Sequence, residues 1–175
     1  AGLGHAIWCA RHLINDEPFA VILADDLITG NSLIGKMINN YTSGNMLAIM
    51  NVEKDEVSSY GIIEPGKFNN NIFEVKKMVE KPSISESPSQ LAIIGRYILD
   101  PEIFNVLSCQ KRGSGNEIQL TDGISSLIGS IPCYGYKFEE QRFDCGSKLG
   151  FLKANISFAL KDDELRTIRE WLEKL

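Results

Sequence analysis

Residues 19–52 read FAVILADDLITGNSLIGKMINNYTSGNMLAIMNV, and the apolar pattern of this stretch changes twice. The run FAVIL (19–23) is continuously apolar, which is typical of a strand buried on both faces of a sheet. Asn31 is a suitable N-cap, and apolar residues then recur at helical spacing as far as Tyr41. MLAIMNV (46–52) is a second apolar run of strand length. A strand, a helix and a strand in this order predict a parallel α/β sheet.

The segments that follow predict more strands and helices, so we expect an α/β fold with a mixed, mainly parallel sheet. Residues 60–99 contain three strand-like runs, YGIIE, IFEVKKMVEK and LAIIGRYIL. PEIFNVLSC and QLTDGISSLIG then read as helices, and PCYGYKFEE with QRFD reads as a returning pair of strands. Closing helices are expected over residues 147–175, with Ser147 as the first N-cap. The last of these helices could pack on this core or on a partner subunit. Its apolar stripe consists of Leu165, Ile168, Leu172 and Leu175.

The composition indicates one globular domain over residues 1–175. The chain is 43% hydrophobic and 23% charged, and its length allows a sizeable core. A formal net charge of -5 argues against nucleic-acid binding. No apolar run approaches the ~20 residues of a membrane span, and no signal-peptide pattern is visible. The four cysteines occur singly, which argues against a zinc site or a disulfide framework and favours a cytoplasmic location.

Two neighbouring carboxylates, Asp25 and Asp26, come directly after the first predicted strand. The carboxyl ends of parallel strands are where open α/β folds bind ligands. Two adjacent carboxylates need a cation or hydrogen-bond donors, so magnesium with a phosphate is a natural ligand. Helix capping or a turn is the alternative, since Asp favours both. Asp144, in RFDCG (142–146), is a candidate second metal ligand from the far end of the chain.

Glu80 and Lys81 lie at the end of a predicted strand and are candidates for binding a sugar phosphate. A carboxylate can accept sugar hydroxyls while an ammonium group meets a phosphate, although an ordinary charged strand end is the alternative. Gly61 could let a ligand approach the backbone or could mark a plain bulge. The segment NEIQLTD (116–122) carries further polar side chains and could be only a capped helix start.

Two glycine patterns resemble phosphate-binding loops only in part. GNSLIGKM (30–37) fits G-x-x-x-x-G-K, but Met37 stands where Ser or Thr would hold magnesium. Its apolar residues also belong to the predicted helix. GLGHAI (2–7) has two of the three glycines of a dinucleotide fingerprint, and no strand precedes it in this sequence.

Taken together, the motifs resemble the bacterial UTP–glucose-1-phosphate uridylyltransferases, also called UDP-glucose pyrophosphorylases. The matching segments occur in that family's order and cover essentially the whole chain. They are GLGHA, DEPFAVILADDLI, SYGII, MVEKP, LAIIGRYIL, GNEIQLTD and RFDCGSKLGFLKAN. The resemblance implies a Rossmann-like nucleotidyltransferase fold. It also implies transfer of a uridylyl group from UTP to glucose-1-phosphate, which gives UDP-glucose and pyrophosphate, with Mg²⁺ and commonly in a homo-oligomer.

The resemblance also implies roles for residues around the nucleotide. Asp25 would coordinate magnesium beside the α-phosphate, and Asp144 would be the second metal ligand. Gly2 would lie against the uracil ring. Ala24 departs from the Pro that is usual in the family, which affects the turn and not the ligand.

On the sugar side, the resemblance implies that Gly61 and Glu80 bind glucose hydroxyls. Lys81 would bind the phosphate of glucose-1-phosphate and is, with the two magnesium ligands, expected to be catalytic. Gly95 would shape the sugar pocket.

The front of the family's pattern does not occur in these residues. That family begins with a glycine-rich nucleotide loop, a catalytic Lys and a Gln that reads the uracil, whereas this sequence begins at GLGHA. With the family's first strands also absent, we expect a carboxyl-terminal part that is inactive alone. Three alternatives stay open: a regulatory paralogue with weak catalysis, a pyrophosphorylase for another sugar phosphate or base, and a dinucleotide-binding module. The incomplete glycine fingerprint disfavours the last.

Overall fold

The computed structural model describes residues 1–165, 167–172 and 174, which group into two compact units. Unit 1 consists of Ala1–Ile22 and Ser32–Glu139, and unit 2 consists of Leu23–Asn31 and Glu140–Leu175. The single domain over residues 1–175 stays a prediction. In the described part of the chain, the structure has no helix that is long and apolar enough to cross a membrane.

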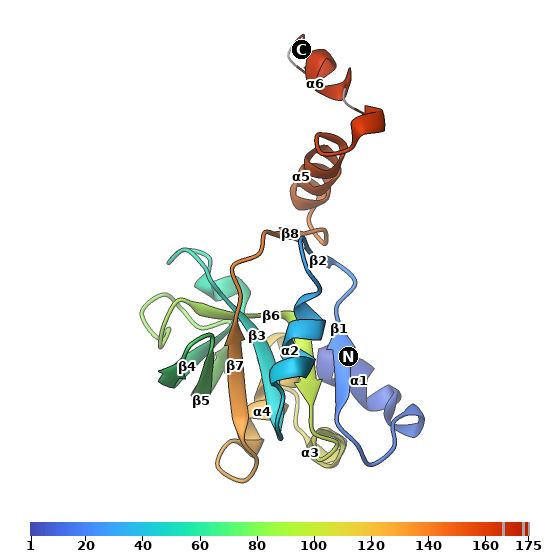
Figure 1. Cartoon of the computed structure of the whole chain (residues 1–175). Coiled ribbons are helices and arrows are strands. Elements are labelled where there is room, and N and C mark those ends of the chain that lie inside the picture. Colours follow the sequence, from blue (N-terminus) through green and yellow to red (C-terminus); the bar gives the residue numbers. More distant parts are fainter. Residues whose placement is uncertain (166, 173, 175) are drawn as a thin grey trace. The chain divides into compact units, whose positions relative to one another are not determined.

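Unit 1 is built on a six-stranded sheet with the order β1-β6-β3-β7-β5-β4 (Figure 1). Strand β6 lies between β1 and β3 and is antiparallel to both. β1 and β3 therefore run in the same direction without being neighbours. The strands are β1 (Phe19–Ile22), β3 (Asn45–Asn51), β4 (Gly61–Asn69), β5 (Ile72–Glu80), β6 (Leu91–Leu99) and β7 (Cys133–Lys137).

The sheet is mixed, as predicted, but the prediction that it is mainly parallel is wrong. Among the described strands, only β3 and β7 pair in parallel. One cause is the connection between β4 and β5, because Asn70 and Asn71 alone join them and so short a loop gives an antiparallel pair. The other cause is the late strand β6, which inserts between the two strands that were expected to be parallel neighbours.

Strand β1 is not buried on both faces, which corrects the interpretation of FAVIL. Its residues alternate between half-buried and exposed, and Ile22 is 53% exposed. The reason is that β1 is at the edge of the sheet. β3 does behave as predicted, since Met46 and Ile49 are fully buried or nearly so.

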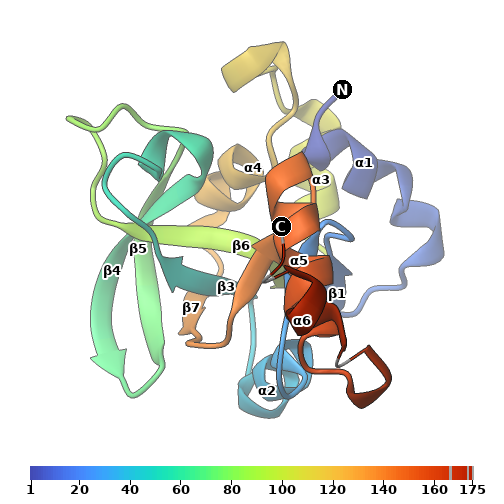
Figure 2. The ribbon, with the colours of Figure 1, turned by 90° about the horizontal axis from the view of Figure 1, so that it is seen from above.

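Helices cover both faces of this sheet (Figures 1 and 2). α4 packs against β5 and contacts α1 and α3, whereas α2 packs against β6 on the opposite face. The N-cap of α2 is Ser32 and not Asn31, because the Ser32 hydroxyl accepts a hydrogen bond from the Gly35 N–H at 3.2 Å. The helices are α1 (Leu3–Cys9), α2 (Leu33–Asn40), α3 (Ile103–Cys109) and α4 (Leu120–Leu127).

Unit 2 contains a short two-stranded ribbon and two helices. The ribbon pairs β2 (Asp26–Ile28) with β8 (Arg142–Asp144) in antiparallel register. The predicted pairing of the PCYGYKFEE and QRFD strands is therefore wrong: β7 belongs to the large sheet, and β8 pairs with a segment from the start of the chain.

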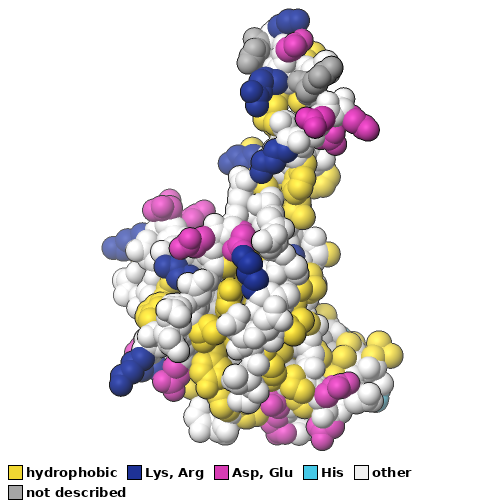
Figure 3. Space-filling model, viewed as in Figure 1, with side chains coloured by type: hydrophobic (Ala, Val, Ile, Leu, Met, Phe, Trp, Pro, Cys, Tyr) yellow, Lys and Arg dark blue, Asp and Glu magenta, His cyan; other side chains and the backbone are white. Residues whose placement is uncertain are grey.

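The helices of unit 2 are α5 (Lys148–Ala159) and α6 (Thr167–Leu172). Ser147 caps α5 as predicted, because its hydroxyl accepts a hydrogen bond from the Gly150 N–H at 3.0 Å. α5 carries apolar side chains around its circumference, and many of them are at the surface in Figure 3. Leu175, the last residue of the predicted closing stripe, lies outside the described residues.

Thiol reactivity provides a test of the sheet. Cys133 is buried in β7, and burial raises its pKa to about 12. At pH 8 its thiolate is therefore scarce, and reagents cannot reach the sulfur. We expect iodoacetamide to modify Cys133 at least ~100-fold more slowly than the exposed Cys109, until guanidinium chloride unfolds the protein. Peptide mass spectrometry measures both rates, and equal rates in the folded protein would contradict the burial of β7.

Candidate functional site

Asp25 and Asp144 converge beside Gly146 in unit 2. Asp26 is paired with Asp144 in the ribbon, and the Cys145 N–H donates a hydrogen bond to the Asp25 carbonyl at 2.7 Å. A Cβ on Gly146 would lie 3.1 Å from Asp25 Oδ2 and 3.1 Å from Asp144 Oδ1. The two carboxylates therefore border the same small space.

This pair of carboxylates has the chemistry of a magnesium site. Both side chains are exposed, and Asp144 Oδ1 accepts one hydrogen bond, from the Gly146 N–H at 3.0 Å. The Asp25 carboxylate has no hydrogen-bond partner among the residues that the structure describes. Carboxylate oxygens suit Mg²⁺, which keeps several waters and binds substrate phosphates. Within residues 1–165, 167–172 and 174, no three His, Cys, Asp or Glu side chains form a metal cluster, so water or phosphate would complete the coordination.

The turn that follows Asp144 depends on small residues. A Cβ on Gly150 would lie 1.9 Å from the Asp144 carbonyl oxygen, so only glycine lets the first turn of α5 pass this close. The Ser147 hydroxyl also donates to that carbonyl, at 3.1 Å. The motif DCGSKLG is thus explained by packing around Asp144, and Cys145 contributes its backbone N–H to this arrangement.

In unit 1, Gly61 lies between two side-chain oxygens. It is the register partner of Glu80. A Cβ at position 61 would lie 3.2 Å from Glu80 Oε2 and 2.9 Å from Thr121 Oγ1. Neither side chain hydrogen-bonds to another described residue. A carboxylate and a hydroxyl that flank bare backbone can both bind an alcohol group of a ligand.

Lys81 follows β5 in an unusual backbone conformation. Its φ is 46°, and the other described non-glycine residues with positive φ are asparagines, Asn70 and Asn116. Asparagine tolerates this region, whereas it is strained for lysine. The Lys81 N–H donates to the Tyr60 carbonyl at 3.0 Å, which holds this turn closed. The Lys81 side chain is exposed and makes no ion pair with any residue that the structure describes, so its charge is available to an anion.

Gly95 lies at an irregularity of β6. The register of β3 with β6 jumps from Leu47–Tyr97 to Ala48–Ile94, so Gly95 and Arg96 are the residues skipped at this irregularity. Bulges of this kind are frequent beside active sites.

Gly2 has a structural reason to be glycine. Its φ is 87°, and a Cβ there would lie 2.5 Å from the Ile118 carbonyl oxygen. That carbonyl accepts the Gly4 N–H at 2.9 Å, so the segment before α1 runs against the segment before α4. The contact of Gly2 with a uracil ring stays a prediction.

Thr121 is the side chain beside Gly61 that the sequence did not single out. The segment around it is more than a capped helix start: the Gln119 amide donates to the Ser114 carbonyl at 2.9 Å and makes no capping bond to α4. Burial also raises the pKa of the Asp122 carboxyl. The residue type gave no signal for Thr121, because its position depends on how α4 packs against β5.

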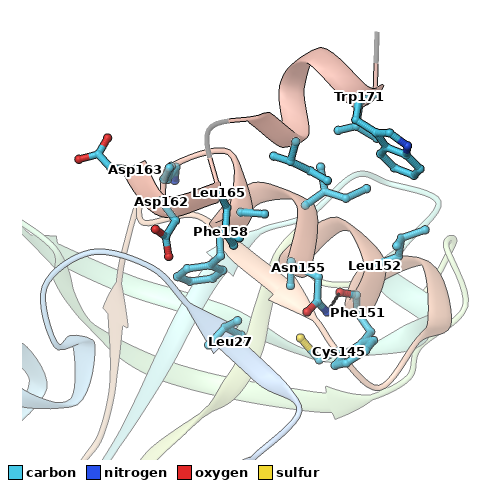
Figure 4. A pocket seen from close by; sticks show the side chains of 16 residues that line it. Leu27, Cys145, Phe151, Leu152, Asn155, Phe158, Asp162, Asp163, Leu165 and Trp171 are labelled. Atoms are coloured by element: carbon cyan, nitrogen blue, oxygen red, sulfur yellow. Dashed lines mark hydrogen bonds between the residues drawn. The ribbon is translucent and has the colours of Figure 1, made fainter. Parts of the chain in front are cut away.

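A groove of about 1160 Å³ lies within unit 2, and its lining includes neither Asp25 nor Asp144 (Figure 4). Leu27 from β2 and Phe158 from α5 face each other at one end, and Asp162 and Asp163 are at the edge. Its lining is mainly apolar. The groove therefore offers mainly packing surface, with Lys161, Asp162 and Asp163 as its charged side chains.

Comparison with known proteins identifies the family. Residues 1–159 match the nucleotidyl transferase family. This chain belongs to that family. UTP–glucose-1-phosphate uridylyltransferase 1 of Staphylococcus saprophyticus is 46% identical over 178 aligned positions, which cover 99% of this chain and 62% of the relative. The UTP–glucose-1-phosphate uridylyltransferase of Komagataeibacter xylinus is 42% identical, with 98% of this chain and 60% of the relative covered.

Solved structures show the same relationship. A UDP-glucose pyrophosphorylase complexed with UDP-glucose has a TM-score of 0.88 and 43% identity, and the match covers 92% of this chain and 63% of that one. A UTP-bound enzyme from Acinetobacter baumannii has a TM-score of 0.80 and 32% identity, with 98% and 61% covered. The nucleotidyltransferase fold is therefore confirmed. The chain spans about three fifths of the length of these relatives.

Filling the space between the two carboxylates tests the metal site. Gly146→Ala would place a methyl group 3.1 Å from both Asp25 Oδ2 and Asp144 Oδ1. We expect this change to weaken Mn²⁺ binding about tenfold, roughly 1.4 kcal/mol, as measured by the electron paramagnetic resonance signal of free Mn²⁺. Gly66→Ala is the matched control, because its methyl group would be equally close to Glu74 in unit 1. Equal affinity of both variants and the unaltered chain would reject the site.

Proposed function

We propose that the protein transfers a uridylyl group from UTP to glucose-1-phosphate, with Mg²⁺ as cofactor, and releases UDP-glucose and pyrophosphate. The observation that carries the proposal is the convergence of Asp25 and Asp144 on the space beside Gly146. Paired carboxylates that hold magnesium suit phosphoryl and nucleotidyl transfer, where charge at phosphorus must be neutralised. The choice of UTP and glucose-1-phosphate follows from the relatives, which are 42–46% identical.

The reaction needs positioning and charge neutralisation more than a side-chain nucleophile. A phosphate oxygen of glucose-1-phosphate attacks the α-phosphorus of UTP in line, and the bond from that phosphorus to the pyrophosphate oxygen breaks, with its electron pair leaving on pyrophosphate. Bound magnesium would offset the negative charge that two anionic substrates bring together. Asp25 and Asp144 would hold the metal, and Lys81 would bind the attacking phosphate.

On the sugar side, Glu80 and Thr121 bind glucose hydroxyls over the backbone of Gly61. The carboxylate of Glu80 accepts a hydroxyl proton, and Thr121 can donate or accept. Support comes from the unpaired state of both side chains within the described chain and from their closeness to position 61. Gly95 shapes the sugar pocket, and Gly2 contacts the uracil.

Self-association and a cytoplasmic location complete the proposal. α5 exposes large apolar side chains, among them Leu149 at 62%, Phe151 at 58% and Leu152 at 55%. Such a surface is typical of an interface between subunits. Light scattering over the micromolar range tests this, and a strictly monomeric protein would contradict it.

The experiment that tests the proposal is a direct assay of UDP-glucose formation from UTP, glucose-1-phosphate and Mg²⁺. The 175-residue chain is compared with a longer version that includes the preceding segment found in its relatives. We expect turnover from the longer protein only, because the nucleotide loop of the family does not occur in these residues. No product from either protein would reject the proposed reaction. N-acetylglucosamine-1-phosphate as a competitor tests sugar selectivity.

Removing either metal ligand is expected to abolish most turnover. In the longer protein, Asp25→Asn or Asp144→Asn should lower kcat at least a hundredfold, or about 2.7 kcal/mol. The amide keeps the shape of the side chain but loses the charge that holds magnesium. Asp55→Asn, on an exposed loop, is the control. Near-normal turnover of the two variants at saturating Mg²⁺ would exclude the two-carboxylate site.

Lys81 is expected to act on one substrate. Lys81→Ala should weaken glucose-1-phosphate binding at least ~10-fold, since the ammonium contact with its phosphate is lost. The KM for UTP should change little. Lys54→Ala, another exposed lysine of unit 1, serves as the control. Steady-state kinetics separate the two KM values, and an unchanged KM for glucose-1-phosphate would refute the role.

A further inference from the structure

Unit 2 contains an ion pair that none of the proposed roles uses. The Arg142 Nε–H donates to Asp26 Oδ1, and the two side chains are only 10% and 8% exposed. Asp26 is next to Asp25 in sequence and opposite Asp144 in the ribbon. The pair therefore lies in the two short strands that carry the proposed metal ligands.

The ribbon is too short to define its own register. It consists of three residue pairs, Asp26–Asp144, Leu27–Phe143 and Ile28–Arg142. Isolated two-stranded ribbons are marginally stable, and a slip by one residue turns every side chain of a strand to the other face. Such a slip would take the Asp144 side chain away from Asp25.

The ion pair distinguishes the observed register from its neighbours. Directly opposite residues point to the same face of an antiparallel ribbon, so Asp26 and Asp144 face each other as like charges. Arg142, two residues before Asp144, is diagonal to Asp26 and compensates this repulsion. In a register slipped by one residue, Asp26 and Arg142 would be on opposite faces and buried without each other, which is strongly unfavourable.

We infer that the Asp26–Arg142 ion pair locks the register in which Asp25 and Asp144 border one space. Asp26 and Arg142 are then positioning residues, which act on the metal through the carboxylates of their neighbours. The register lock itself is independent of the reaction, whereas its consequence for metal binding rests on the proposed function.

The test is a double variant, Asp26→Leu with Arg142→Met. Replacing both partners by apolar side chains leaves no lone buried charge, so the chain keeps its fold. Amide hydrogen exchange is measured at the two ends of the ribbon, where the Cys145 N–H donates to Asp25 and the Thr29 N–H donates to Gln141 at 2.9 Å. We expect both amides to exchange at least tenfold faster than in the unaltered chain.

The Phe151 amide, bonded to the Ser147 carbonyl at 2.9 Å in the first turn of α5, is the internal control and should keep its protection. Arg142→Lys, which keeps the charge, should retain most of the protection at Cys145 and Thr29. Unchanged exchange at these two amides in the double variant would overturn the lock. An equal loss of protection at all three amides would also overturn the register lock, because the ion pair would then stabilise unit 2 as a whole and not the ribbon register.

The Mn²⁺ affinity of the same variants tests the consequence for the metal. We expect the double variant to bind Mn²⁺ about tenfold more weakly and Arg142→Lys to bind it nearly as well as the unaltered chain. Lost ribbon protection with unchanged Mn²⁺ affinity would overturn the positioning role. An unaltered chain that binds no Mn²⁺ would overturn the metal site of the proposed function and the positioning role with it, while hydrogen exchange would still decide the lock.

Discussion

The insertion of β6 between β1 and β3 is the constraint on which unit 1 depends. β6 is buried along nearly its whole length and hydrogen-bonds to strands on both sides. A strand buried in this way needs cover on both faces, which α2 and the group of α1, α3 and α4 provide. With one edge of β3 occupied by β6, the other edge accepts β7 in parallel. The direction of every other strand follows from these pairings.

The ribbon of unit 2 depends on a contact between two segments that are far apart in the sequence. Asp26 and Arg142 are 116 residues apart, yet the entropy of closing a loop grows only slowly with its length. The register of the two strands is the less certain part of such a contact, because three residue pairs supply few hydrogen bonds to fix it. The close packing at Gly150 and the cap at Ser147 fix the β8 side of the ribbon. The buried Asp26–Arg142 ion pair requires a specific side-chain geometry, whereas a small apolar contact would tolerate several registers.

The sequence predicted elements better than their partners. MLAIMNV and LAIIGRYIL are apolar for longer than a turn or a loop permits, so their burial as strands could be foreseen. Nothing in either run predicts that the two strands are neighbours, and the prediction of a mainly parallel sheet was wrong for that reason. Asn31 and Ser32 are both good N-caps, and only the hydrogen bond to Gly35 distinguishes them. At the site, sequence motifs indicated Asp25, Glu80 and Asp144. The position of Thr121 beside Gly61 depends on how α4 packs against β5, which the apolar periodicity of the sequence does not predict.

The residues beside Gly61 have side-chain pairing and backbone conformation that do not suit their residue types. Glu80 and Thr121 leave polar atoms unpaired, and Lys81 adopts a strained backbone that glycine or asparagine would take more easily. In each case a residue better suited to the local structure is easy to name. Local sequence and local structure disagree most often where a protein binds or reacts, because a group already satisfied by its neighbours has no capacity left for a ligand. Substitutions that relieve this disagreement should stabilise the fold and weaken binding together.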